Sequence, residues 1–558
     1  MGDDMTKAAR TGAEILVDAL IGHGADHAFC VPGESFLAVL DAFVGRDIGV
    51  TVCRHESGAA IMAEAAGKMT GKPGIAFVTR GPGATNASAG VHIAFQDSTP
   101  MILFIGQVGR DQRDREAFQE VDYRAMFGPL AKWAAEIDDP ARVPEYVSRA
   151  FHIAVSGRPG PVVLALPEDM LREHAEATDV RPARAVAAHP ASADMDTLAD
   201  LLSRAERPFV IAGGGGWDGN AARDLRAFAE AWELPVGLSL RCQDYMSGDS
   251  ASYAGHVGIG IDPQLAARVK DADVLLVLGA RLGEMTTSGY TLVTPPDPEQ
   301  VLIHAHASAD EIGHVYRPAL GLAAGAKAMT AALANLAPPR ARPWAERTQE
   351  ARAGFLAWSQ PVPNAGPVQM AEVVRTVGEM VPEDAIVSNG AGNYTAWVHR
   401  FHRFRHWRTQ LAPTSGSMGY GLPAAVGAKR VAPERTVVNF AGDGCFLMTG
   451  QEMATAAKYG LGLVTVVVNN SMYGTIRMHQ EKAYPGRVSA TDLTNPDFAA
   501  LARAYGGHGE TVERTEEFAP AFRRALDSGG PAIVEVRLDP EAILPAKTLA
   551  EIRGTQAR

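Results

Sequence analysis

Short, continuous apolar runs recur along the whole chain, and longer alanine-rich stretches with helical spacing separate them. A strand that is apolar on both faces must be buried on both faces, as in a parallel sheet covered by helices. The pattern therefore predicts an α/β protein. The runs fall into three groups, which begin with "GIAFVT" (74–79), "PFVIAG" (208–213) and "DAIVSNG" (384–390).

Two segments rich in proline, alanine and arginine interrupt this pattern, at 178–195 and 337–367. Because they show little apolar periodicity, we expect linkers there. The chain of 558 residues is then long enough for three consecutive domains, each a doubly wound parallel sheet, at 1–180, 190–340 and 365–558. The first and third domains could be distant copies of one architecture.

Overall charge and cysteine spacing argue against several classes of function. A formal net charge of −12 would repel nucleic acids and anionic membranes. We expect no membrane span and no signal peptide, because long apolar runs are absent and the N-terminus is acidic. Four scattered cysteines suggest neither a zinc site nor disulfides and favour the cytoplasm. The basic run "HRFHRFRHWR" (399–408) is a local exception, either an exposed or subunit-facing strip or an anion site.

An aspartate and an asparagine follow two consecutive predicted strands in the third group. The strand "TVVNFAG" ends at Asp443, and "LGLVTVVV" ends just before Asn470. One right-handed crossover between neighbouring strands would bring both residues to one rim of the sheet. Oxygen ligands there suit Mg²⁺, although GDG and NN taken singly are ordinary turn sequences. Gly442 and Gly444 would let the chain turn tightly and bring N–H groups close to a phosphate.

GDG followed at this spacing by NN resembles the thiamine diphosphate-binding signature of thiamine-dependent decarboxylases and acetolactate synthases. The resemblance implies thiamine diphosphate and Mg²⁺ as cofactors. It implies as metal ligands Asp443, the Asn470 side chain and the backbone carbonyl of Met472.

A second match lies in the first domain, where RHE-x-G-A, TGKPG and GPGATN closely resemble the pyrimidine-binding domain of acetolactate synthase-like enzymes. Glu56 follows a strand and opens a helix; taken alone, it could be a first-turn residue favoured by the helix dipole. In the family, this carboxyl activates the cofactor by bonding to ring N1′. The pyrimidine domain of one subunit there faces the diphosphate domain of another, which implies a homodimer or homotetramer.

Two glycine-rich stretches complete the implied cofactor site. "PTSGSMGYGLPAAVGAK" resembles the stretch in which Met418 bends the coenzyme, and "SNGAGNYTAW" aligns with the diphosphate loop. Acetolactate synthases carry Gln-His-Gln where this chain has Asn393, Tyr394 and Thr395, which leaves the exact activity open. The implied cofactor-binding residues are Pro32, Gly33, Glu56, Gly81, Asn86, Gly390, Ala391, Gly392, Asn393, Tyr394, Gly416, Met418, Asp443, Gly444, Cys445, Asn470, Met472, Tyr473 and Gly474.

The segment that begins "GQVGRDQRD" resembles the acetolactate synthase substrate loop. Lys132 in this segment is otherwise interpreted as an exposed lysine. His479 stands where acetolactate synthases usually have a tryptophan; it either polarises an acceptor or lies at the pocket rim, and its surroundings also resemble benzaldehyde lyase. The absence of a His-His dipeptide favours carboligation over plain decarboxylation. The implied catalytic residues are Glu56, Gln107, Phe118, Lys132 and His479.

The second domain contains a GxGxxG match at Gly214, Gly216 and Gly219, after a strand and before a helix. Four consecutive glycines satisfy this pattern easily, so a tight turn and a dinucleotide contact are both open. Acetolactate synthases carry FAD in this domain, which makes FAD a third candidate cofactor.

The resemblance covers nearly the whole chain and predicts an acetolactate synthase-like carboligase or lyase. Such an enzyme decarboxylates a 2-oxo acid and transfers the acyl unit to a carbonyl acceptor. The alternatives are a benzaldehyde lyase-like enzyme, a 2-oxo acid decarboxylase, a flavin-dependent enzyme of the pyruvate oxidase type, and a non-catalytic nucleotide-binding scaffold. Intact Glu56, Asp443 and Asn470 count against the scaffold.

Overall fold

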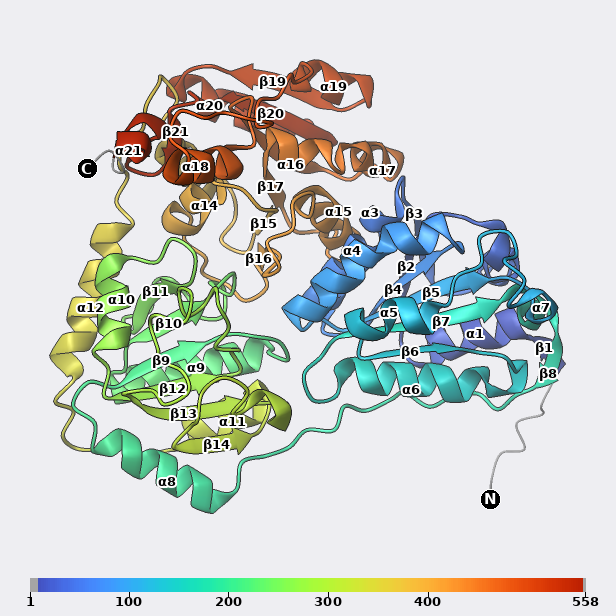
Figure 1. The fold of residues 1–558 in the computed structure, drawn as a ribbon, viewed down its shortest axis with the longest axis horizontal. Coiled ribbons are helices and arrows are strands. Elements are labelled where there is room, and N and C mark those ends of the chain that lie inside the picture. The colour runs from blue at the N-terminus through green and yellow to red at the C-terminus, as the bar shows by residue number, and fades with distance from the viewer. Residues whose placement is uncertain (1–8, 555–558) are drawn as a thin grey trace. The chain divides into compact units, whose positions relative to one another are not determined.

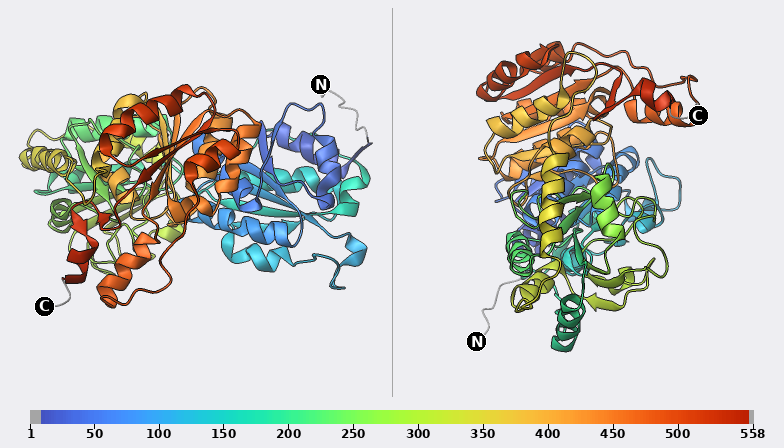
Figure 2. Two further views of the ribbon diagram at one scale, coloured as in Figure 1. Left: turned by 90° about the horizontal axis from the view of Figure 1, so that it is seen from above. Right: turned by 90° about the vertical axis from the view of Figure 1, so that its left-hand side faces the viewer.

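The computed structural model describes residues 9–554 and contains three six-stranded sheets, each entirely parallel (Figures 1 and 2). All the apolar runs that begin the three predicted groups form strands in them. The chain divides into two compact units: the first holds the first sheet together with residues 426–433, and the second holds the other two sheets. The prediction of a three-sheet α/β protein is therefore confirmed.

The first sheet has its apolar core on both faces. Leu16 and Phe151, from two of its helices, belong to the same core cluster as Phe77 and Phe104 of the central strands, whose rings stack at 4.8 Å. The strands are, in spatial order, β3 (Gly49–Val52), β2 (His27–Cys30), β4 (Gly74–Val78), β5 (Met101–Gln107), β7 (Pro161–Pro167) and β6 (Trp133–Glu136). The helices are α1 (Gly12–Gly22), α2 (Leu37–Ala42), α3 (Glu56–Thr70), α4 (Pro82–Asp97), α5 (Tyr123–Phe127), α6 (Val143–Val155) and α7 (Glu168–Arg172), and β1 (Ala9–Thr11) pairs with β8 (His174–Glu176).

The second sheet is covered in the same way (Figure 1). Its strands are, in spatial order, β11 (Tyr253–Val257), β10 (Val236–Ser239), β9 (Phe209–Ala212), β12 (Val274–Leu278), β13 (Val301–His306) and β14 (Leu320–Ala323). Its helices are α8 (Ser192–Ser203), α9 (Gly219–Trp232), α10 (Pro263–Lys270), α11 (Ala326–Ala334) and α12 (Ala345–Trp358).

The third sheet has the spatial order β16 (Gln410–Leu411), β15 (Ile386–Asn389), β17 (Val437–Gly442), β18 (Leu463–Asn469), β20 (Pro531–Arg537) and β19 (His508–Val512). A short hairpin of β21 (Ala542–Leu544) and β22 (Lys547–Thr548) follows it. The helices of this part are α13 (Met370–Met380), α14 (Thr395–Phe401), α15 (Gly421–Val431), α16 (Asp443–Leu447), α17 (Met453–Lys458), α18 (Gly474–Ala483), α19 (Phe498–Ala504), α20 (Thr515–Asp527) and α21 (Leu549–Gly554).

The first and third sheets share one strand order. Numbered along the chain within each sheet, the strands of both run 2-1-3-4-6-5, whereas those of the second run 3-2-1-4-5-6. The shared order supports the expectation that the first and third domains are copies of one architecture. The different order of the second sheet makes it a separate type of domain.

The two predicted linkers differ. Residues 178–191 form neither helix nor strand and are largely exposed, as expected, whereas residues 192–195 of the same predicted linker belong to α8. The prediction is wrong for the second segment, because α12 lies within it. Only a narrow face of that helix is apolar: Ala351 is buried and Phe355 packs against the ring of Tyr253 at 4.7 Å. So few apolar positions leave no detectable helical period in the sequence.

Three arginines of the basic run at 399–408 are occupied by contacts within the second unit. Arg403 and Arg405 bind the carboxylate of Asp249 at 3.1 and 2.7 Å. The Arg400 guanidinium lies 3.6 Å from the centre of the Trp358 ring. The run is therefore a packing surface inside the second unit, and its acidic partner is too distant in sequence to be foreseen.

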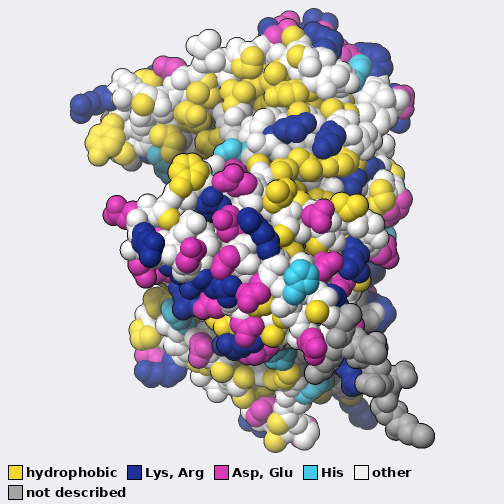
Figure 3. All heavy atoms as spheres, turned by 90° about the vertical axis from the view of Figure 1, so that its right-hand side faces the viewer, with side chains coloured by type: hydrophobic (Ala, Val, Ile, Leu, Met, Phe, Trp, Pro, Cys, Tyr) yellow, Lys and Arg dark blue, Asp and Glu magenta, His cyan; other side chains and the backbone are white. Residues whose placement is uncertain are grey.

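The surface, the helices and the cysteines add three observations. On the face drawn in Figure 3, Lys and Arg side chains lie among Asp and Glu side chains rather than in a patch of one sign. In residues 9–554, no helix is both long and apolar enough to cross a membrane. All four cysteines are buried, and none of them forms a disulfide.

Candidate active site

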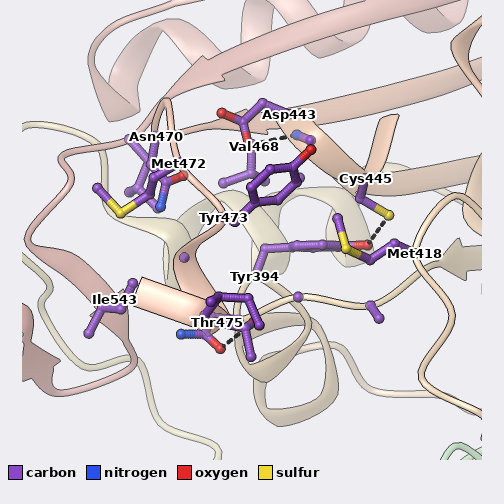
Figure 4. A pocket seen from close by; sticks show the side chains of 18 of the residues that line it. Tyr394, Met418, Asp443, Cys445, Val468, Asn470, Met472, Tyr473, Thr475 and Ile543 are labelled. Carbon is purple, nitrogen blue, oxygen red and sulfur yellow. Dashed lines mark hydrogen bonds between the residues drawn. The ribbon is translucent and has the colours of Figure 1, made fainter. Parts of the chain in front are cut away.

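A cavity of about 230 Å³ lies at the carboxyl edge of the third sheet (Figure 4). Its walls come from the segments that follow β15, β16, β17, β18 and β20, the position at which open parallel sheets bind ligands. The predicted third-domain cofactor residues that line the cavity are Ala391, Gly392, Asn393, Tyr394, Gly416, Met418, Asp443, Gly444, Cys445, Asn470, Met472, Tyr473 and Gly474. Gly390, at the end of β15, is not among the lining residues.

Asp443 and Asn470 are brought to one rim by the pairing of β17 with β18. The two strands are parallel neighbours, and Gly442 pairs with Val468, so Asp443 and Asn470 follow their strands within one residue of the same level. In Figure 4, both side chains and Met472 lie along one side of the cavity. The backbone carbonyl of Met472 accepts the Gly474 N–H at 2.9 Å and retains a second lone pair.

The Asp443 carboxyl is buried, with 2% of the residue exposed. Its Oδ1 accepts the Gly444 N–H at 2.9 Å, and its Oδ2 accepts the Asn495 amide at 2.7 Å. Burial raises the pKa of Asp443, although these hydrogen bonds act in the opposite direction. A cation beside this carboxylate would compensate for its lost hydration.

The available donors suit a hard cation. Residues 9–554 hold no group of three or more His, Cys, Asp and Glu side chains that could bind a metal. An ion at Asp443 must therefore take amide, carbonyl and phosphate oxygens as its other ligands. Mg²⁺ is bound in this manner, with few protein carboxylates and the phosphates of a ligand.

Gly442 and Gly444 are not needed for a tight turn, which corrects the expectation from the sequence. Neither has a positive φ. A Cβ on Gly444 would lie 2.6 Å from Cε1 of Tyr473, and one on Gly442 would lie 3.2 Å from Cδ1 of Tyr394. The absence of a side chain is what lets these rings pack beside Asp443.

Neutral groups form the other end of the cavity. The Tyr394 hydroxyl accepts the Gly390 N–H at 3.0 Å and lies 3.5 Å from Sγ of Cys445 (Figure 4). The same sulfur accepts the Gly419 N–H at 3.2 Å. Burial raises the pKa of Tyr394 well above its ordinary value, so the phenol stays protonated.

A hydrogen bond joins two walls of the cavity. The Thr475 hydroxyl, on α18, donates to Oδ1 of Asn393 at 2.9 Å. The loop after β15 is thereby tied to the helix after the cation site. His479 lies further along α18, is exposed, and is not among the lining residues.

The predicted residues of the first domain also gather at a carboxyl edge, that of the first sheet. Glu56 is the first residue of α3, and Nδ2 of Asn86 on α4 donates to its Oε2 at 3.0 Å. Gly81 precedes α4 with a φ of 60°. Pro32 and Gly33 follow β2 on the same edge, and a Cβ on Gly33 would lie 2.4 Å from Cβ of Thr79.

The predicted substrate loop is fastened to the Gly81 turn. The Gly81 N–H donates to the Tyr123 hydroxyl at 2.8 Å, and Arg80 Nε donates to the Phe118 carbonyl at 3.1 Å. Gln107 is buried and donates to the Val121 carbonyl at 2.9 Å. Phe118 itself is 73% exposed.

Lys132 lies apart from that turn. Its ammonium donates to the carbonyls of Ile153 and Ser156 at the end of α6. A cation at this position satisfies carbonyls that have no partner within the helix.

The glycine run of the second domain follows β9, next to β12, where the strand order reverses. The Asp218 carboxylate accepts the Ala221 N–H at 2.9 Å and caps α9. It occupies a donor that a dinucleotide phosphate would require, and its charge would repel that phosphate. The Trp217 indole N–H donates to the Gly213 carbonyl at 2.8 Å, so this geometry favours the tight turn.

Sequence reasoning missed Asn495, which touches Asp443 directly. It lies in "TNPDF", and an Asn-Pro pair ahead of a helix is typical of an ordinary turn. No pattern in the sequence distinguishes it.

Fold and site together define a cofactor-dependent α/β enzyme that holds a phosphorylated ligand through a cation. The chain belongs to the thiamine pyrophosphate enzymes: the family models match in chain order, with the N-terminal TPP binding domain at residues 10–126, the central domain at 195–333 and the C-terminal TPP binding domain at 390–536. Thiamine diphosphate, the same compound as thiamine pyrophosphate, and Mg²⁺ are therefore its cofactors, and the cavity described above suits both.

Several curated proteins are similar over almost the whole chain. The acetolactate synthase large subunit of Parasynechococcus marenigrum is 34% identical over 95% of this chain and 87% of its own length. The acetolactate synthase isozyme 2 large subunit of Escherichia coli is 30% identical over 95% of both chains. Acetolactate synthase of Bacillus subtilis is 29% identical over 96% of both. The protein is thus an acetolactate synthase-like enzyme, which confirms the resemblance found in the motifs.

Proposed function

We propose that this enzyme decarboxylates a 2-oxo acid and transfers the acyl unit to a carbonyl acceptor. The observation that carries the proposal is the common rim of Asp443, Asn470 and the Met472 carbonyl, on a cavity whose far end is neutral. The names of the relatives support the same reaction class.

The third-domain residues would bind the charged end of the cofactor. Asp443, Asn470 and the Met472 carbonyl hold Mg²⁺, and the glycines of the loop after β15 allow the diphosphate to approach the backbone. Met418 supports the bent coenzyme. When bound, thiamine diphosphate supplies the carbon nucleophile for the 2-oxo acid and takes up its electron pair as CO₂ leaves.

The first-domain residues would act on the pyrimidine ring and the substrate. Glu56 holds a proton at ring N1′, and the Asn86 amide keeps its carboxyl in place. Gln107 and Phe118 would lie beside the substrate. His479 would lie at the rim of the pocket, and Lys132, whose ammonium binds carbonyls at the end of α6, would have a structural role.

We propose a homodimer or homotetramer in which Glu56 of one chain serves the third domain of another. Its compartment would be the cytoplasm, in keeping with four cysteines that form no disulfide. FAD in the second domain remains a prediction.

The direct test is Glu56→Gln. The variant cannot share a proton with the ring, so turnover should fall by about 10²-fold or more while thiamine diphosphate and Mg²⁺ still bind. Glu145→Gln, an exposed change on α6, is the matched control. Turnover is measured as CO₂ release and cofactor binding by calorimetry. Undiminished turnover in Glu56→Gln would refute the mechanism.

A substrate panel decides among the related activities. The protein is incubated with thiamine diphosphate, Mg²⁺ and varied 2-oxo acids, with and without aldehydes, and the products are identified by mass spectrometry. A joined hydroxy ketone product supports the proposal. A free aldehyde alone indicates a decarboxylase, cleavage of a hydroxy ketone a benzaldehyde lyase-like enzyme, and bleaching of bound flavin an oxidase. No product from any mixture would support the scaffold.

A further inference from the structure

A short segment of residues 491–495, here called the strap, is fastened to the loop that holds two of the proposed metal ligands. The Tyr473 N–H donates to the Thr491 carbonyl at 2.8 Å, and the Leu493 N–H donates to the Ser471 carbonyl at 2.9 Å. Between these bonds, Met472 and Asp492 form an antiparallel bridge. The strap therefore fixes the backbone around the Met472 carbonyl.

The strap ends in Asn495, whose amide joins the two strand ends of the cation site. Its Nδ2 donates to Oδ2 of Asp443 at 2.7 Å and to Oδ1 of Asn469 at 2.9 Å. One side chain thus contacts a proposed ligand and the neighbour of another. No other described side chain donates a hydrogen bond to both.

Asn469 is held in turn by the sheet. Its Nδ2 donates to Oε1 of Glu535 at 2.8 Å, and the other carboxylate oxygen of Glu535 accepts the Thr511 hydroxyl at 3.0 Å. Glu535 is buried on β20 and Thr511 lies on β19. Hydrogen bonds consequently connect Asp443, through Asn495 and Asn469, to two rigid strands.

The orientation of the Asn495 amide is determined by its partners. Exchanging its oxygen and nitrogen would set the oxygen against two acceptors, one of them a carboxylate. Its Oδ1 is buried and has no hydrogen-bond partner among residues 9–554. A buried acceptor without a partner is unfavourable. We infer that the two hydrogen bonds donated by the amide N–H groups are the reason for an asparagine at this position.

We propose that Asn495 is a positioning residue for Mg²⁺: its amide holds the Asp443 carboxylate and the Asn469–Asn470 strand end in the arrangement that binds the cation. The proposal rests on the proposed metal site. The Asn495 amide takes only one of the about four acceptor positions of the ionised Asp443 carboxylate. The residue itself touches neither substrate nor cofactor.

The test is a Mg²⁺ titration of the full-length protein at fixed thiamine diphosphate, followed by calorimetry and by turnover. In Asn495→Leu, the half-saturating Mg²⁺ concentration should rise about 10–100-fold, the usual effect of losing a residue that orients a metal ligand. Turnover at saturating Mg²⁺ should recover to within a few-fold of wild type. Thr494→Ala, an exposed change in the same strap, should leave the titration unchanged.

Thermal melting without metal or cofactor distinguishes a role of Asn495 in Mg²⁺ binding from a role in the stability of the fold. A merely structural role would lower the melting temperature and leave the Mg²⁺ midpoint within twofold of wild type, which would overturn the proposal. If Asn495→Leu does not fold, Asn495→Ser, which is smaller and polar, must show the same shifted midpoint. If wild type binds thiamine diphosphate with Mg²⁺ and the variants bind equally well, only this inference fails; if wild type binds neither, the proposed function fails with it.

Discussion

Gly444 is required because a Cβ atom at this position would clash with its neighbours. Its φ is not positive, and a Cβ there would meet the Tyr473 ring at 2.6 Å and Leu493 at 3.1 Å. Tyr473 lines the cavity, and Leu493 lies in the strap. The GDG motif therefore preserves space beside Asp443 rather than an unusual backbone conformation.

We expect Gly444→Ala to displace the Tyr473 ring and cost about 1–3 kcal/mol, the usual effect of an added carbon in a packed site. Thermal melting should show lower stability, and calorimetry should show weaker binding of thiamine diphosphate. Gly530→Ala is the control, because nothing lies within 4 Å of a Cβ there and its φ is not positive. Equal behaviour of the two variants would contradict this explanation.

For single residues, the sequence predicted the proposed metal ligands but not the side chain that holds them in position. Asp443 and Asn470 stand out because both follow apolar strands one crossover apart. Asn495 follows no strand and reaches them only after the chain has folded back through α18. A side chain whose partners are set by tertiary contacts leaves no local pattern.

Among the elements, α18 and α21 are joined by one buried carboxylate. Glu481, on α18 and 1% exposed, accepts two hydrogen bonds from Arg553 on α21, both at 2.8 Å. Arg477 adds a third at 3.1 Å. The hydrogen bonds from Arg553 are the largest cause that lowers the pKa of Glu481 to about 2.

This contact should be lost in acid. Since the folded pKa is about 2 and the ordinary value is 4.5, the contact stabilises the fold fully above pH 4.5 and progressively less as the pH falls towards 2. Glu481→Gln should melt at a lower temperature than wild type at neutral pH, and the difference should shrink below pH 4.5. Exposed Glu346→Gln is the control. A difference that does not change with pH would show that charge is not the cause.

Elements differ in how well the sequence predicts them. Central strands such as β5 and β18 are continuous apolar runs, and their positions were predicted closely. The edge strand β16 has two residues and no pattern to detect. Strand order depends on long-range pairing, so the match between the first and third sheets became visible only in the structure.

For the whole molecule, the proposed assembly can be tested by mixing two inactive chains. Glu56→Gln lacks the proposed activator, and Asp443→Ala lacks a proposed metal ligand. If each site combines Glu56 of one chain with Asp443 of another, a mixed dimer restores one intact site of two. An unfractionated random mixture should therefore recover roughly a quarter of wild-type activity, and isolated mixed dimers roughly half.

The chains are coexpressed with different tags, and mixed dimers are isolated by two affinity steps before turnover is measured. Each variant expressed alone is the control and should stay inactive. If both residues of a site come from one chain, mixed dimers will show no more activity than either parent. That result would refute the shared site while leaving the cofactor assignment intact.

Because Asp443 is buried, the stability of the folded chain should depend on whether its cofactors are bound. The ionised Asp443 carboxylate is buried and its hydrogen-bond donors are neutral. It therefore lowers the stability of the folded chain until a cation and its diphosphate bind. Ligands that bind only the folded form stabilise it by about 2.7 kcal/mol at a hundred times their dissociation constant. The protein without thiamine diphosphate and Mg²⁺ should therefore be cleaved by proteases sooner than the protein saturated with both.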